Sequence, residues 1–146
     1  MQLTVQRTID APIDRVFDTV AHIENFSQAV PSIVRAEILS EVKTGAGTRF
    51  RETRLMGGRE ATTELEVTEY VANDRVRIVA DSHGTVWDTL FTVRPEGDAT
   101  ELVIAMDARP HTLVTRIMTP IMKGFFRKGM EKHIDEVRAH CEAASV

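Results

Sequence analysis

The feature that most constrains this chain is a run of alternating apolar and polar residues, interrupted by turn signals, between Ser32 and Arg109. Alternation places successive side chains on opposite faces of a strand, so each segment is expected to have one buried and one solvated face. Turn residues such as Gly57-Gly58 and His83-Gly84 recur about every ten residues, a spacing typical of an antiparallel meander. The sequence therefore predicts a continuous antiparallel sheet with one apolar face.

Seven strands are expected, one before this run and six within it. They span residues 3–9, 33–42, 48–56, 59–70, 75–81, 85–93 and 100–108. Two short helices, over 13–20 and 22–30, are predicted between the first two strands. Pro31 ends the second of them, because the residue before a proline is disfavoured in the α region.

Beyond Pro110 the pattern becomes helical. Because proline lacks an N–H and clashes with the preceding turn, Pro120 is expected to separate a short helix at about 111–118 from a long one. The long helix is predicted from Thr119 or Pro120 to about residue 143. Two glycines within it, Gly124 and Gly129, lower its helix propensity by about 1 kcal/mol each. They suggest that the sheet or a ligand approaches this helix closely.

A sheet with one apolar face must bury that face, and the long C-terminal helix is the one predicted element large enough to cover it. We therefore expect an α+β fold, with residues 1–146 forming a single domain. A strongly twisted sheet wrapped around one helix rarely closes along its whole length. An apolar cavity is predicted between the sheet and the helix, where a ligand would bind.

Several short patterns resemble the START-related superfamily, which includes polyketide cyclases, lipid-transfer domains and pollen-allergen-like proteins. They comprise Ile9-Asp10-Ala11-Pro12 with Val16-Phe17, Gly45-x-Gly47, Glu66-Val67-Thr68-Glu69-Tyr70, and the hairpin from Phe91-x-Val93 to Thr100-x-Leu102, followed by the long helix. The resemblance covers residues 1–142. It implies a helix-grip fold, in which a seven-stranded antiparallel sheet wraps around a long C-terminal helix. Members bind hydrophobic or amphipathic small molecules, and only some of them catalyse a reaction.

The amino-acid composition limits the classes of binding partner and the cellular compartments that we expect. The chain has 18 basic and 22 acidic residues, which argues against nonspecific nucleic-acid binding through phosphate neutralisation. Its single cysteine, Cys141, excludes a disulfide scaffold and suits a reducing compartment. The first residues lack the pattern of a secretory signal peptide, and no apolar run reaches the ~20 residues of a membrane span. A cytoplasmic location is expected.

Metal and nucleophile chemistry find little support in the sequence. His133, Glu136 and His140 share roughly one helix face beside Cys141, but their spacing matches no zinc-binding motif. Histidines at a core boundary explain the pattern more simply. Because no nucleophile-elbow motif is present either, we expect neither a metal nor another cofactor.

The segment from Arg49 to Met56 carries the chemically most informative residues. If Phe50 and Met56 face the cavity, the period of two places Glu52 and Arg54 there as well. Buried charges need partners, so the two would pair with each other or with a ligand. They could orient a polar ligand group, or act as general acid and electrostatic stabiliser. A shift of one residue would instead turn Arg49, Arg51 and Thr53 inward, and the sequence leaves this choice open.

The predicted ligand-binding residues are mainly aromatic or methionine, side chains that pack against ligands of varied shape. They are Phe50, Glu52, Arg54, Trp87, Phe91, Met106, Met118, Met122, Phe126 and Met130. Of these, Glu52 and Arg54 are the catalytic candidates, although the sequence does not decide whether the protein is an enzyme.

The first functional hypothesis is a protein that binds a hydrophobic or aromatic small molecule, with or without cyclase or dehydratase chemistry. The alternative is a lipid or quinone carrier that docks on membranes through the basic face of the last helix. The basic excess of residues 111–146 lies in Arg116, Lys123, Arg127, Lys128 and Lys132. A solvated helix face explains these charges more simply, so membrane contact is the less favoured interpretation. A structural protein with a filled core, and any oligomeric state, also remain open.

Overall fold

The computed structural model describes residues 1–143 of the chain and contains seven strands and four helices. In chain order they are β1 (Gln2–Ile9), α1 (Ile13–Ala21), α2 (Ile23–Ala29), β2 (Ile33–Ile38), β3 (Arg49–Met56), β4 (Arg59–Val71), β5 (Arg75–Ser82), β6 (Thr85–Glu96), β7 (Ala99–Pro110), α3 (Leu113–Ile121) and α4 (Lys123–Ala143).

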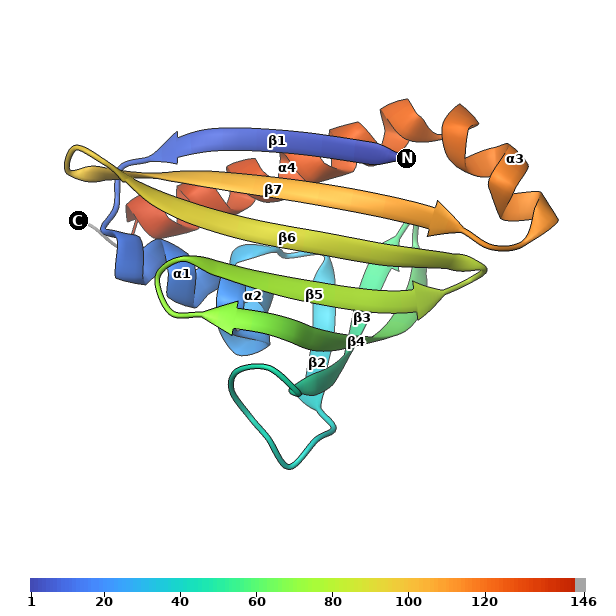
Figure 1. Ribbon diagram of the computed structural model, residues 1–146, viewed down its shortest axis with the longest axis horizontal. Helices are drawn as coiled ribbons and strands as arrows, with labels where there is room; N and C mark the ends of the chain where they lie inside the picture. The colour runs from blue at the N-terminus through green and yellow to red at the C-terminus, as the bar shows by residue number, and fades with distance from the viewer. Residues whose placement is uncertain (144–146) are drawn as a thin grey trace.

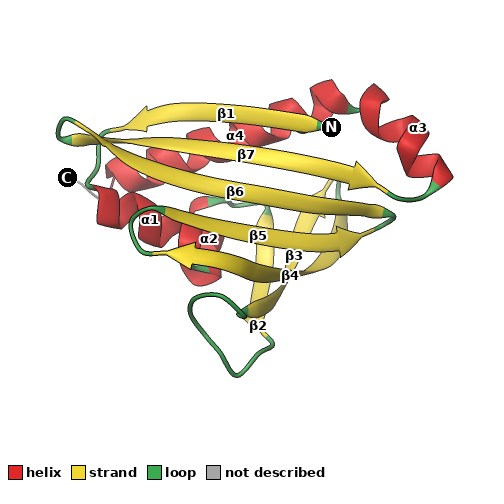
Figure 2. Ribbon diagram, in the orientation of Figure 1, coloured by secondary structure: helices red, strands yellow, loops and turns green. Residues whose placement is uncertain are grey.

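The strands form one antiparallel sheet in the order β1-β7-β6-β5-β4-β3-β2. Strands β1 and β2 are therefore the two edges, and α1 and α2 connect one edge to the other. The pairing register shifts between Ile33 and Arg35 and between Val67 and Glu69, and such irregularities add local bend and twist to a sheet. The sheet curves so that α4 lies along its concave side (Figures 1 and 2). The α+β helix-grip architecture predicted from the sequence is confirmed.

Alternate residues of the strands face α4 and the helices α1 and α2. The fully buried side chains come from strands at one edge and the middle of the sheet, from α1 and from the second half of α4, and include Leu3, Ile9, Phe17, Val20, Val76, Leu102, Ile134, Val137 and Cys141. These residues form a continuous apolar core. Burial of apolar surface, which stabilises a fold by about 25 cal/mol per Å², is the main stabilising contribution here.

The convex face of the sheet carries cross-strand ion pairs. Arg51 on β3 donates to Glu37 on β2 at 2.9 Å and to Glu64 on β4 at 2.8 Å. Further along the sheet, Arg75 and Arg77 hydrogen-bond Glu69, and these bonds hold the pKa of that carboxyl below its usual value. Because these charges are solvated, they contribute little to stability and mainly define the outer face.

Two strand boundaries differ from the prediction by more than two residues. Strand β2 ends at Ile38 rather than at residue 42. After it, the Ser40 hydroxyl accepts from the Arg49 N–H at 2.9 Å, and such local side-chain bonds compete with a regular ladder. Strand β6 continues to Glu96, which pairs with Ala99 across a two-residue turn. The connection between the predicted strands 85–93 and 100–108 therefore contracts to this tight turn.

The break between the last two helices also lies later than predicted. Pro120 lies inside α3, and the break comes at Met122, whose N–H donates to Met118 O at 3.0 Å and to Thr119 O at 3.2 Å. The turn after Pro120 thus closes with local bonds before α4 begins at Lys123. A proline near a helix end removes one backbone donor without forcing an immediate stop.

Candidate ligand-binding cavity

A cavity of about 800 Å³ lies between the concave face of the sheet and helices α3 and α4. Buried residues of α1 and α2, among them Val20 and Ile23, close one end. At the other end, Met56, Met118 and Phe125 line the cavity and are also 45–59% exposed. The cavity therefore opens between the β3–β4 turn and α3. Its volume lies within the range of sites for small organic ligands.

All ten residues named from the sequence as ligand-binding candidates lie on the wall of this cavity. They are Phe50, Glu52 and Arg54 on β3, Trp87 and Phe91 on β6, Met106 on β7, Met118 on α3, Met122 between the helices, and Phe126 and Met130 on α4. That these side chains contact a ligand remains a proposal.

The orientation of β3, which the sequence left open, is now defined. Phe50 pairs with Leu65 of β4, and Glu52 pairs with Thr63. All four residues line the cavity, as do Arg54 and Met56. The alternative register would have turned Arg51 inward, whereas its guanidinium pairs with acidic residues on the convex face.

The cavity contains one charged cluster. Glu52 is 6% exposed, and its Oε1 accepts a hydrogen bond from Arg54 Nε at 2.8 Å. Arg54 Nη1 lies 3.2 Å from His133 Nε2 on α4. Since a guanidinium has only donors, His133 Nε2 accepts and its ring proton lies on Nδ1. The cluster thereby links the sheet to the helix across the cavity.

His133 is neutral at physiological pH. Burial is the main cause and the positive charges of Arg54 and Lys132 add to it, lowering the pKa of His133 from 6.5 to about 4. A neutral imidazole can accept from Arg54, whereas an imidazolium would be repelled by it. The pKa and the hydrogen bond therefore support the same tautomer.

Aromatic side chains form much of the remaining wall. Trp87 of β6 meets Phe126 of α4 edge-to-face, with ring centroids 5.0 Å apart. Phe126 in turn contacts the exposed Phe125 at 5.8 Å. Near the closed end, Phe26 and Phe91 make a similar contact at 6.0 Å. Such pairs hold the rings in place and present flat apolar surfaces to the cavity.

The sheet does not approach the two glycines of α4 closely. A Cβ built at Gly124 or Gly129 would meet no neighbouring atom within 4 Å. Of the two expected explanations, close packing of the sheet is therefore wrong, and close approach of a ligand stays a prediction. Gly129 instead borders the cavity, so a larger side chain there would enter open space.

His133 was predicted only as a core-boundary histidine and was not among the ligand-binding candidates. The available signal was its spacing: His133 follows Met130 by three residues and Phe126 by seven, which places it on the cavity side of the same helix. The contribution of α1 and α2 to the cavity, including Ala21 and Phe26, was also not predicted. Periodicity alone does not show which end of a curved sheet these helices will close.

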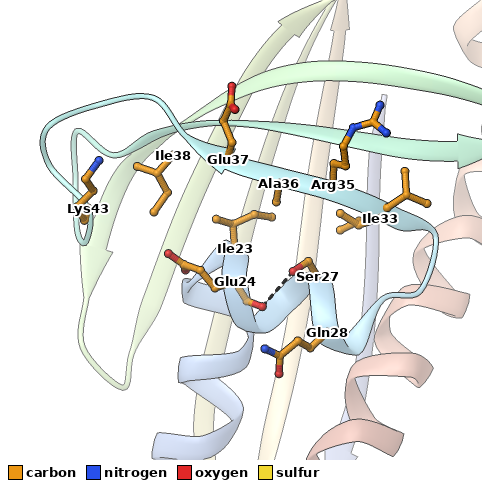
Figure 3. A pocket seen from close by; sticks show the side chains of 11 residues that line it. Ile23, Glu24, Ser27, Gln28, Ile33, Arg35, Ala36, Glu37, Ile38 and Lys43 are labelled. Carbon is orange, nitrogen blue, oxygen red and sulfur yellow. Dashed lines mark hydrogen bonds between the residues drawn. The ribbon is translucent and has the colours of Figure 1, made fainter.

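A second hollow, of about 550 Å³, lies on the surface between α2 and β2 (Figure 3). Ile23, Ala36 and Ile38 are among its lining residues. Arg35 and Glu37 turn away from α2 in Figure 3, and they pair with Glu60 and Arg51 on the convex face. This hollow lacks the buried charged cluster of the internal cavity, which is the stronger candidate site.

Residues 1–143 offer little support for metal binding or for a cysteine nucleophile. No group of three His, Cys, Asp or Glu side chains there is arranged to hold a metal ion. Cys141 is buried, its Sγ lies 3.4 Å from Thr19 Oγ1 on α1, and burial raises the pKa of its thiol. A buried thiol with a raised pKa is a poor nucleophile.

Comparisons with known proteins agree with this geometry. Residues 1–142 match the family described as polyketide cyclase / dehydrase and lipid transport. A protein from Thermus thermophilus has a similar structure, with a TM-score of 0.81 and 18% identity over 100% of both chains. A START superfamily protein from Mycobacterium smegmatis gives 0.75 at 17% identity, over 95% of this chain and 97% of that one.

The di-domain ARO/CYC protein StfQ of the steffimycin biosynthetic pathway gives a TM-score of 0.81 at 10% identity, over 99% of this chain and 51% of StfQ. At such identities these structures establish the fold alone. The family match over residues 1–142 confirms the predicted resemblance to polyketide cyclases and lipid-transfer domains. No protein of curated function shows significant sequence similarity to the chain. Across the described part of the chain, no helix is long and apolar enough to cross a membrane.

Proposed function

The chain belongs to the polyketide cyclase/dehydrase and lipid transport family, and on that premise we propose that its cavity binds a hydrophobic or aromatic small molecule carrying one polar oxygen. The observation that carries this proposal is a mainly apolar cavity of about 800 Å³ with a hydrogen-bonded charged cluster on its wall. Sites for small molecules combine these two features, since apolar walls supply affinity and few polar groups fix orientation.

Arg54 is the residue we assign to orientation. A guanidinium has five N–H donors, and the bonds to Glu52 and His133 use two of them. Arg54 therefore keeps donors for a carbonyl, phenol or carboxylate oxygen of the ligand. Glu52 and His133 hold the guanidinium from two sides, which fixes its position before a ligand arrives.

The same cluster could support cyclisation or dehydration of a polyketide-like substrate. Arg54 would stabilise the negative charge that develops on a carbonyl oxygen, and Glu52 would move a proton. His133 Nε2 already accepts from Arg54, so His133 serves positioning in this scheme. If the reaction uses Glu52, Glu52→Gln abolishes turnover while leaving the fold intact, and unchanged turnover would remove this part of the proposal.

Filling the cavity from one glycine tests whether it is the binding site. Gly129→Leu directs a side chain into the cavity, whereas Gly124→Leu makes the same change on an exposed part of the same helix. Both variants gain helix propensity, so both should fold. Titration with the amphipathic fluorophore anilinonaphthalene sulfonate should show about ten-fold weaker binding for Gly129→Leu only.

Native mass spectrometry of the purified protein, followed by denaturing extraction, would identify a co-purified compound. Equal fluorophore binding by the two leucine variants, together with an empty wild-type protein, would contradict the proposal. That result would favour a protein whose cavity has no ligand.

A further inference from the structure

Helix α3 exposes an unusual amount of apolar surface. Leu113, Val114, Ile117 and Ile121 are each 58–75% exposed, and they follow one another at helical spacing along its outward side. Phe125, in the first turn of α4, extends this row. Contiguous apolar surface of this kind on a single element indicates a contact site, whereas scattered apolar side chains do not. We call these five residues the α3 surface.

The opposite side of the same helix lines the cavity. Met118 and Thr119 of α3 lie on the cavity wall, and Met122 follows them. Figure 1 shows α3 projecting beyond the end of β7, away from the closed end formed by α1. From Phe125 the aromatic contacts run inward through Phe126 to Trp87. The α3 surface is therefore separated from the cavity by one helix and adjoins its opening.

The backbone at the start of α3 is held in place. His111 N donates to Gly84 O at 2.8 Å, and Thr115 Oγ1 donates to the same oxygen at 2.9 Å. Thr112 and Thr115 form a reciprocal cap on the first turn, which satisfies backbone donors that a helix start leaves open. The apolar row is thus presented in a fixed orientation.

The chain segment that carries the α3 surface is positively charged. Residues 111–130 contain Arg116, Lys123, Arg127 and Lys128 and no acidic residue, although the whole chain has a net charge of −4. Basic residues beside an apolar helix face favour the surface of a bilayer that contains anionic lipid. A second copy of the chain on the same surface would bring these like charges together, which disfavours a symmetric dimer.

From these observations we infer that the α3 surface docks on anionic membranes and places the opening of the cavity against the lipid. Apolar side chains enter the interface while the basic residues contact headgroups. A hydrophobic ligand then passes between bilayer and cavity without crossing water. Only this last step rests on the proposed ligand binding, because the other four residues of the α3 surface lie outside the cavity and Phe125 lies at its opening.

Co-sedimentation with vesicles tests the inference. The protein should bind phosphatidylcholine vesicles that contain phosphatidylglycerol, bind weakly to phosphatidylcholine alone, and dissociate as salt is raised. Ile117→Asp with Ile121→Asp should weaken binding by about ten-fold or more. The matched control is Val42→Asp with Val71→Asp, which adds the same two charges at exposed apolar residues outside α3 and α4 and should bind as the wild type does.

Charge reversal gives a second readout. Lys123→Glu with Lys128→Glu should weaken binding to anionic vesicles by about five-fold or more for each position. Arg49→Glu with Arg94→Glu makes the same change at exposed positions away from the opening and should have a much smaller effect. All variants should retain fluorophore binding in solution, which separates docking from ligand binding.

Three outcomes would overturn the inference. The wild type could fail to bind either vesicle type, the α3 variants could bind as well as their controls, or sedimentation velocity could show a dimer that Ile117→Asp dissociates. In the last case the occupant of the α3 surface would be a second copy. If the wild type binds vesicles but does not bind the fluorophore, the proposed function is contradicted and the docking inference stands.

Discussion

The two halves of helix α4 lie against one sheet, but one half packs in the core and the other lines the cavity. In its second half, Ile134, Val137 and Cys141 are completely buried against the core. In its first half, Phe125 is exposed, Phe126 and Gly129 border the cavity, and His133 reaches Arg54. The difference teaches that stability is concentrated at the closed end, so the open end can keep unfilled space and a charged cluster that a well-packed core would exclude.

The largest expected effect comes from shortening one side chain at the closed end and comparing it with one at the open end. Ile134→Ala should lower the free energy of unfolding by about 2–5 kcal/mol, because it removes fully buried methyl groups and leaves a cavity. Met118→Ala, on the half-exposed wall of the opening, should cost less than about 1 kcal/mol. Urea denaturation of both variants gives the two values, and equal losses would show that the ends are packed alike.

Removing one charge of the Glu52–Arg54 pair should destabilise the protein more than removing both. Arg54→Met leaves the buried carboxylate of Glu52 without its cation, and should lower the free energy of unfolding by about 2–3 kcal/mol, since Arg54 is itself partly solvated. Adding Glu52→Leu should recover much of that loss, because no unpaired charge remains. If the double variant is less stable than Arg54→Met, the pair does not behave as a coupled unit.

Comparing prediction with structure shows the same division between the two ends. Period-two alternation located all seven strands, and the four-residue spacing of Met118, Met122, Phe126 and Met130 located one side of the cavity. Both patterns follow from local geometry, which sequence carries directly. The closed end depends on how α1 and α2 fold back across the sheet, and spacing along the chain does not encode that contact.

The cluster illustrates a second limit. The alternation on β3 linked Glu52 to Arg54, but it could not state which face was inward, because a shift of one residue reverses it. His133 lies far from both in sequence and joins them only through the curvature of the sheet. Likewise, the exposed row of α3 contains Leu113, Ile117 and Ile121, residues that a sequence pattern would place in a core.

The smallest expected effect concerns protonation at the boundary between the two ends. The pKa of His133 is lowered to about 4 by burial and by Arg54 and Lys132, while in the unfolded chain it returns to about 6.5. Between these values the unfolded state binds more protons, so this contribution to stability is fully present above pH 6.5 and is lost as the pH falls toward 4. Because the ring nitrogen accepts from Arg54, protonation also removes a link between sheet and helix.

His133→Gln keeps an acceptor for Arg54 and removes the titration. Between pH 7 and pH 5 the wild type should therefore lose about 1–2 kcal/mol more stability than this variant, as measured by urea denaturation at each pH. The imidazole proton resonances of His133, assigned by their absence in the variant, should titrate with a midpoint well below that of an exposed histidine. A midpoint near the ordinary value, or identical pH dependence of the two proteins, would mean that the imidazole reaches solvent. In that case the hydrogen bond from Arg54 would not hold His133 of α4 in the cavity wall.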